Sequence, residues 1–224
     1  YWIPTQGQGV FLLPKQSLST QLLRRSNSTE PVGLCALATS PEGQLYAGGE
    51  KGEVYWVNEK QELELVIPAP PRPLNANCRV NSMLFDNDGG LWLSRQSFGL
   101  TYHSRVEAPP RFLMELLQKE PADPFGLVKS RETGDILNLL CKNLSWDSRT
   151  ERLFIGRGQS SVLLDCKPTK PQAQFLFKNR SYASVFLPNG DLIIGDMGQL
   201  YRYTADEQSP PAPMLPRTVA PVYA

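Results

Sequence analysis

FDNDGGLWLS, residues 85–94, decides the fold of this chain, because its pattern returns three more times. An apolar run is followed by a tight turn and then by an apolar triplet that ends in a small residue. The other copies are LATSPEGQLYAG (37–48), LSWD to RLFIG (144–156) and VFLPNGDLIIG (185–195), and a half copy, YWIPT, opens the chain at 1–5. Trp2, Tyr46, Trp92, Phe154 and Ile193 hold equivalent places, so the steps are 44, 46, 62 and 39 residues. Propeller blades repeat at roughly this spacing.

Each copy divides into four short strands with turns between them, which is the unit of a propeller blade. In the second copy we expect strands over 80–85, 91–95, 99–104 and 111–117. The sequence therefore predicts an all-β fold, with a single β-propeller domain over 1–224 and five four-stranded blades. Their approximate bounds are 219–224 with 1–26, 32–68, 79–119, 136–178 and 181–216.

The two ends of the chain complement each other in this pattern. Residues 217–224 match an inner strand, and residues 1–5 match the strand that follows it. We therefore expect Val219 to Tyr223 to pair antiparallel with Tyr1 to Thr5 and to close the ring, which removes open edge strands. The alternative is a fragment of a longer array of blades.

One step in the repeat is about 17 residues longer than a blade of ~45 residues. The surplus falls in 118–135, a polar stretch with two prolines and two glycines. A loop of this length is uncommon unless it is functional or disordered. A binding role and a tolerated surface insertion are both open.

Composition excludes several classes of partner. Lys and Arg number 23 against 22 Asp and Glu, a net charge of +1, so no basic footprint predicts a nucleic-acid partner. No apolar run reaches the roughly 20 residues of a membrane span, and residues 1–4 lack the features of a signal peptide. A membrane would be reached only through segments outside this chain.

Few residues suit a metal or a catalytic centre. The four cysteines show no CxxC spacing and His103 is the single histidine, so no metal site and no cofactor is expected. Cys35 and Cys141 fall in inner strands, where we expect small buried hydrophobes. His103 is expected to be an exposed strand residue.

Catalysis has little support because a single histidine cannot be placed in a Ser-His-Asp triad. Glu50 and Asp196 follow second strands at what look like equivalent positions, and paired carboxylates are the requirement for glycoside hydrolysis. Solvated loop acids are the commoner explanation. The sequence therefore predicts no catalytic residues and a chain that is not an enzyme, with a propeller glycosidase or lyase as the alternative.

Binding is better supported, because loops after the second strands emerge on one face of a propeller and converge there. Gln and Arg side chains in these loops suit a small polar ligand such as a carbohydrate or a small acid. Arg95 and Arg157 are expected to clamp one group from two sides, and their loss to leave the fold intact. Ordinary loop polarity and a protein-interaction scaffold remain alternatives. The predicted ligand-binding residues are Gln8, Glu50, Arg95, Gln96, Arg157, Gln159, Asp196 and Tyr182.

The stretch 85–94, continued by Gly99-Leu100-Thr101-Tyr102, resembles the two-component regulator propeller repeat. That repeat shows an acidic-Gly turn, Leu-Trp, a small residue and a Gly-Leu pair before Tyr. The resemblance implies an extracytoplasmic sensor domain of a bacterial signal-transduction protein, periplasmic or extracellular, that binds a ligand and acts on a signalling module outside this chain. Five blades are fewer than is usual in this family. The copy at 144–156 departs most, because Ser148-Arg149-Thr150-Glu151 replaces the glycine turn.

Overall fold

The computed structural model describes residues 2–5, 9–12, 23–25, 32–71, 77–112, 141–158, 160–167, 172–177, 180–196, 199–204 and 210–214. Their regular structure consists of strands. Within these residues no helix is long and apolar enough to cross a membrane. The all-β prediction is confirmed.

Four sheets follow one another along the chain, each with consecutive strands paired antiparallel. The first sheet adds β3, which lies parallel to β7 at its outer edge. Its strands are β3 (Arg24–Arg25), β4 (Leu34–Thr39), β5 (Leu45–Gly49), β6 (Val54–Val57) and β7 (Glu62–Ile67). The second has β8 (Val80–Phe85), β9 (Leu91–Arg95), β10 (Gly99–His103) and β11 (Arg111–Phe112). The third has β12 (Cys141–Asp147), β13 (Arg152–Arg157), β14 (Ser161–Asp165) and β15 (Gln172–Phe177). The fourth has β16 (Ala183–Phe186), β17 (Leu192–Asp196), β18 (Gln199–Tyr203) and β19 (Ala212–Pro213).

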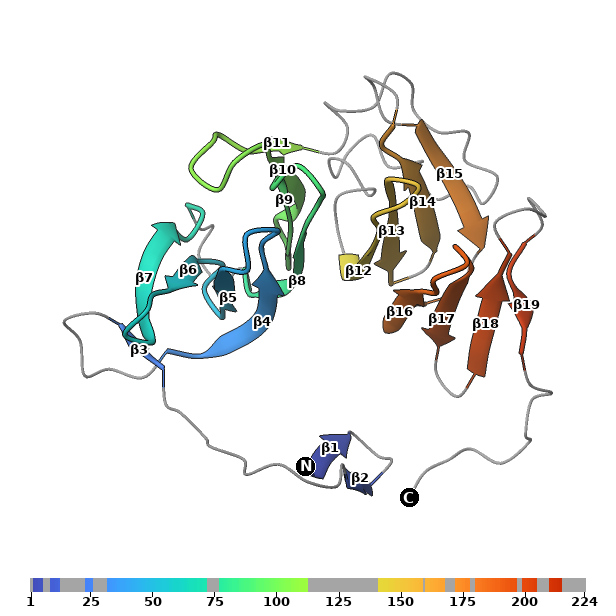
Figure 1. Cartoon of the computed structure of the whole chain (residues 1–224), viewed down its shortest axis with the longest axis horizontal. Helices are drawn as coiled ribbons and strands as arrows, with labels where there is room; N and C mark the ends of the chain where they lie inside the picture. The colour runs from blue at the N-terminus through green and yellow to red at the C-terminus, as the bar shows by residue number, and fades with distance from the viewer. Residues whose placement is uncertain are drawn as a thin grey trace.

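The first strands of the four sheets, apart from β3, lie side by side and form the inside of an arc (Figure 1). Polar side chains join them: Asn81 donates to the Cys141 carbonyl at 3.0 Å, and Ser145 donates to the Ser184 carbonyl at 2.8 Å. Asn143 also donates to the Ser181 hydroxyl at 3.2 Å. Asn143 contacts Ser181 and, two residues later, Ser145 contacts Ser184, so the contacts advance along both strands in the same direction. The inner strands therefore run parallel to one another. The arrangement is propeller-like.

An aromatic residue from the second strand of each of the first three sheets packs toward the next sheet along the chain. Trp92 is 3% exposed and lies among Leu153 and Ile155 of the third sheet. Phe154 is fully buried against Leu192 of the fourth sheet. Tyr46 packs in the same way toward the second sheet. The prediction that these aromatics anchor packing between sheets is confirmed for these three.

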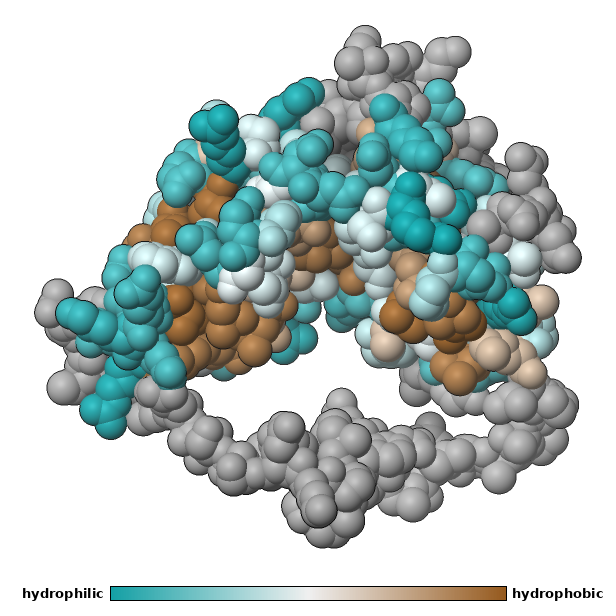
Figure 2. Space-filling model, in the orientation of Figure 1, coloured by the Kyte–Doolittle hydropathy of each residue, from teal (hydrophilic) through white to brown (hydrophobic). Residues whose placement is uncertain are grey.

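The arc is open between the first and fourth sheets, and the pair β1 (Trp2–Thr5) and β2 (Gly9–Leu12) lies in that opening (Figure 1). Apolar side chains gather on both flanks of the opening (Figure 2). Leu37 of β4 and Val185 of β16 are 61% and 53% exposed there. Residues 219–223 and 118–135 lie outside the described residues, so the predicted closing strand and the insertion do too. The described sheets do not form a closed ring.

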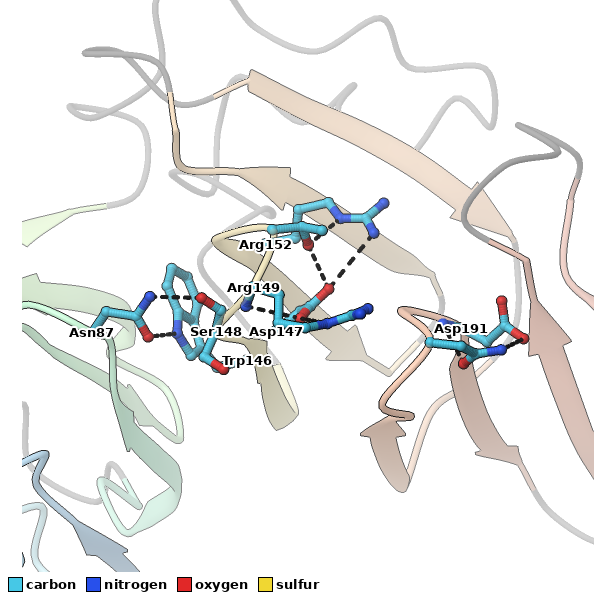
Figure 3. Close-up of polar contacts among 9 residues, drawn as sticks. Asn87, Trp146, Asp147, Ser148, Arg149, Arg152 and Asp191 are labelled. Carbon is cyan, nitrogen blue, oxygen red and sulfur yellow. Dashed lines mark hydrogen bonds and ion pairs between the residues drawn. The ribbon is translucent and has the colours of Figure 1, made fainter.

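The turns between first and second strands are built around an acid or a hydroxyl. In the second sheet the Asp86 carboxylate accepts from the Gly90 amide at 2.7 Å, and Gly89 takes a φ of 80°. The third sheet has no glycine here, and Glu151 takes the positive φ, 52°. Asp147 holds that turn together by accepting from Thr150 Oγ1 at 2.5 Å and from the Arg149 amide at 3.1 Å (Figure 3). The third turn therefore closes without a glycine, with Glu151 in the left-handed conformation and Asp147 bonded to Thr150 and Arg149.

We expect the Asp147 turn to lose stability in acid. Burial alone would raise the pKa of Asp147, but hydrogen bonds from Thr150 and Arg149 and the charges of Arg149 and Arg152 outweigh it and lower that pKa. The stabilisation is therefore fully present above the ordinary value of about 3.9 and is lost as pH falls through the lower folded pKa. Unfolding free energies measured between about pH 2 and 6 should fall less steeply in Asp147→Asn than in the parent. Asp88→Asn, at an exposed turn position, serves as the control, and equal slopes in all three proteins would contradict the prediction.

Candidate ligand-binding site

A β-bulge recurs at the start of the inner strands. The register shifts between Leu34 and Ala36, between Val80 and Ser82, and between Cys141 and Asn143. Cys35, Asn81 and Lys142 are the extra residues, and Tyr182 holds the same place in the repeat of the fourth sheet. Since the inner strands run in one direction, these four residues lie at the same end of the four inner strands. We call this end of the strands the bulged end. Bulges commonly redirect side chains next to functional sites.

Cationic side chains from three consecutive sheets stand at the bulged end. Arg79 and Arg180 are exposed and occupy the same repeat position, two residues before Asn81 and Tyr182. Each arginine donates to the side chain of its bulge residue: Arg79 Nε lies 3.3 Å from Asn81 Oδ1, and Arg180 Nη1 lies 3.3 Å from Tyr182 OH. Lys142, half-buried, is the bulge residue of the third sheet. These repeat positions place positive charge at the bulged end of three consecutive sheets.

The loops after the second strands are fixed to the same end by backbone hydrogen bonds. The amides of Glu50 and Gln96 donate to the carbonyls of Gly33 and Arg79, both at 2.9 Å. The Glu50 side chain covers Gly33, where a Cβ atom would come within 2.3 Å of its carboxylate carbon. The half-buried Gln96 has a buried Oε1 with no hydrogen-bond partner among the described residues. Acidic and amide groups therefore lie beside the arginines.

Arg95 and Arg157 lie between sheets, which differs from the exposed clamp that the sequence predicts. Arg95 is 3% exposed and faces the first sheet, where its Nε donates to the Gly52 carbonyl at 2.8 Å. Burial lowers the pKa of Arg95 to about 10. Arg157 is 5% exposed and donates to Ser160 Oγ at 3.1 Å. Strand alternation aims both side chains at the preceding sheet, so the expectation that their loss leaves the fold intact does not follow from this geometry.

We expect Arg95→Ala to lower the free energy of unfolding by about 2 kcal/mol, because the Gly52 carbonyl would lose its donor inside an interface. Denaturant unfolding measures this change, with Arg111→Ala, at an exposed position of β11, as the control. A loss below about 0.5 kcal/mol, the scale of a surface substitution, would contradict the interface role.

The two acids proposed as a catalytic pair do not hold equivalent positions. Asp196 pairs with Gln199 and aligns with Gly49, Arg95 and Arg157, whereas Glu50 aligns with Gln96. Strand alternation aims Asp196 at the third sheet, and it is half-buried. Glu50 lies two residues after Gly48, whereas Asp196 lies one residue after the equivalent Gly195. Gln8 and Gln159 lie outside the described residues, and Tyr182 is 48% exposed at the bulged end.

The cysteines and the histidine depart partly from expectation. Cys141 is buried as predicted, and burial raises the pKa of its thiol to about 11. Cys35 is exposed, because the outward side of β4 faces the opening. His103 is 2% exposed, with Nδ1 3.0 Å from the Ala108 carbonyl, and burial lowers its pKa. Within the described ranges no group of three His, Cys, Asp or Glu residues could hold a metal ion.

Sequence reasoning missed Arg79, Asn81, Lys142 and Arg180. A signal was present, since Arg79 and Arg180 occupy the same position ahead of the inner strand in two aligned copies. Guanidinium and ammonium groups next to amides and an exposed tyrosine can bind carboxylates and hydroxyl groups, and the tyrosine ring offers a face for a sugar. The bulged end therefore has the chemistry of a site for a polar or anionic ligand.

No protein-family model and no curated protein sequence matches the chain. Among solved structures, it is similar to the extracellular domain of a protein assigned as a hybrid two-component system of B. thetaiotaomicron, with 17% identity and a TM-score of 0.61. The match covers 87% of this chain and 24% of the other, so the chain spans about a quarter of that domain's length. A protein of unknown function from Bacteroides caccae matches with 10% identity and a TM-score of 0.50, over 81% of this chain and 59% of the other.

The chain is also similar to a gluconolactonase from Xanthomonas campestris, with 8% identity and a TM-score of 0.54, over 79% of this chain and 60% of the other. This likeness contradicts the prediction, made from the single histidine, that the chain is not an enzyme, because an enzyme has a similar arrangement of sheets. At these identities the likeness shows the fold alone. The resemblance to two-component regulator propellers is therefore confirmed at the level of the fold.

Proposed function

We propose that the chain is an extracytoplasmic ligand-binding domain, periplasmic or extracellular, of a bacterial signal-transduction protein. It binds a small polar ligand such as a carbohydrate at the bulged end and passes the signal to a module outside this chain. The observation that carries the proposal is the placement of Arg79, Lys142 and Arg180 at one end of three consecutive sheets. The likeness to the extracellular domain of a protein assigned as a two-component system supports the same proposal.

The charges favour a ligand that carries both hydroxyl and carboxylate groups. Arg79 and Arg180 present guanidinium groups that form charge-assisted hydrogen bonds, while Glu50 and Gln96 supply acceptors for hydroxyl groups. Tyr182 provides an exposed ring for the apolar face of a sugar. Of the residues predicted from the sequence, Glu50, Gln96 and Tyr182 stay in the proposed site with Gln8 and Gln159. Arg95, Arg157 and Asp196 are left out, because their shared strand position faces the preceding sheet.

We further propose that 1–224 forms one domain and that a fifth blade, containing β1 and β2, closes the ring. Ile193 of the fourth sheet holds the place of Trp92 and Phe154, and it faces away from the third sheet, in register with Val185. Ile193 and Val185 therefore form an apolar surface on the fourth sheet, and a following blade would cover this surface. On the other flank, Leu37 of β4 is 61% exposed and offers the apolar surface for the same blade.

A thermal-shift screen of the whole chain tests the binding function. The panel holds neutral oligosaccharides, oligosaccharides that contain uronic acids, and small organic acids. Uronic-acid sugars should raise the melting temperature most, because they match both kinds of group at the bulged end. A panel in which nothing shifts the melting temperature would refute the proposal.

A further inference from the structure

A second candidate site lies on the outward side of the first sheet, which is the side that faces away from the second sheet. A pocket of about 210 Å³ is lined by Arg25, Lys51, Glu53, Tyr55, Leu65 and Ala69. Tyr55 and Leu65 are cross-strand partners on that side. The volume exceeds the ~30 Å³ share of one water molecule several times. None of the cations of the bulged end lines this pocket.

Glu53 brings a buried carboxylate with one unused oxygen into the pocket wall. Its side chain is 6% exposed, and Oε1 accepts from Tyr55 OH at 3.1 Å and lies 3.6 Å from Arg25 Nη2. Oε2 is buried and has no hydrogen-bond partner in the described part of the chain. Gly49 makes room for the group, because a Cβ there would come within 2.6 Å of the carboxylate carbon. An unsatisfied buried carboxylate oxygen is costly, so a donor from a ligand is favoured.

Arg25 provides the complementary unused donor. Its Nη2 donates to Tyr55 OH at 2.5 Å, and its guanidinium lies 5.3 Å from the centre of the Tyr55 ring. The Nε atom is buried and has no partner among the described residues. One ion pair thus offers a free acceptor and a free donor. A hydroxyl group satisfies both, since it donates and accepts.

The charged and apolar groups around the pocket indicate which chemical groups the ligand carries besides the hydroxyl. Arg25 and Lys51 contribute two positive charges against one negative charge on Glu53, a net charge of +1. Leu65 and Ala69 supply an apolar wall for C–H groups. We propose that this pocket binds a small hydroxy carboxylate of the sugar-acid class, with a hydroxyl group between Glu53 and Arg25 and the carboxylate toward Lys51.

Calorimetric titration of the whole chain with D-glucuronate, D-glucose and acetate, at matched ionic strength, tests the proposal. Glucuronate should bind at least about tenfold more tightly than glucose, which lacks the charge, and than acetate, which lacks the hydroxyls. Lys51→Ala should weaken glucuronate binding about tenfold. Lys60→Ala, an exposed lysine in the turn at the other end of the same sheet, should leave it unchanged.

Glu53→Gln keeps the side-chain shape and should reduce the preference for glucuronate over acetate, with the fold checked by thermal unfolding. An Arg79→Ala, Arg180→Ala double variant should leave binding at this pocket unchanged, which separates it from the bulged end. The proposal is overturned if glucuronate up to about 10 mM gives no binding, if glucose binds equally well, or if Lys51→Ala and Lys60→Ala bind alike.

Discussion

Trp92→Ala should lower the free energy of unfolding by about 3–5 kcal/mol, the usual cost of removing a buried tryptophan side chain. Trp92 is 3% exposed, and its ring centre lies 4.6 Å from that of Tyr102. Leu153, Ile155 and Leu164 of the third sheet share its cluster. The substitution would therefore open a cavity between two sheets, and partial collapse around it would recover only part of the loss. Denaturant unfolding monitored by far-UV circular dichroism measures the change.

Trp56 supplies the matched control, because it is only half-buried on β6. Trp56→Ala should cost distinctly less than Trp92→Ala. A loss below about 1 kcal/mol for Trp92→Ala would show that the second and third sheets are not packed through this residue in solution.

Val185→Asp should lower the free energy of unfolding by about 3 kcal/mol, because the proposed fifth blade would enclose an unpaired charge in an apolar interface. Val185 is 53% exposed beside the opening, and its cross-strand partner is Ile193. Without a covering blade, an aspartate there would be solvated and nearly harmless. Val185→Thr keeps the side-chain shape and isolates the effect of charge. A change within about 0.5 kcal/mol, as at an ordinary surface position, would mean that the opening stays uncovered.

The fold could be predicted from the sequence where turns and strand periods agree. Strands 80–85 and 91–95 appear with the predicted bounds, and the aromatic residues pack between sheets, because a period of two fixes the side of each residue once the turn is located. The bulges were not foreseen, since an extra residue leaves no mark in a hydrophobic pattern. The difference between Glu50 and Asp196 has another origin, because they lie four and three residues after the equivalent Tyr46 and Ile193.

The structure brings only some of the predicted site residues together at one end of the sheets. Gln96, Glu50 and Tyr182 lie at the bulged end, whereas Arg95 and Arg157 are buried between sheets. The last two residues of a strand point to opposite sides of its sheet. The sequence alone does not tell which of the two side chains a neighbouring sheet covers. Arg79 and Arg180 precede inner strands, outside the loops after the second strands that hold most of the predicted site residues.

Titration of the strongest sugar ligand from the screen into the Arg79→Ala, Arg180→Ala double variant tests the central claim most directly. Both this variant and the parent carry Lys51→Ala, so that the pocket of the first sheet does not contribute. Both arginines are exposed and donate only within the bulged end and its loops, to Asn81, Tyr182 and Gly158 among the described residues, so the variant should stay folded. Loss of two charge-assisted contacts should weaken binding by at least about tenfold, and added salt should weaken the parent more than the variant. Arg105→Ala, an exposed arginine beyond the far end of β10, should bind as the parent does. Equal affinity in the parent and the double variant would contradict a ligand site at the bulged end.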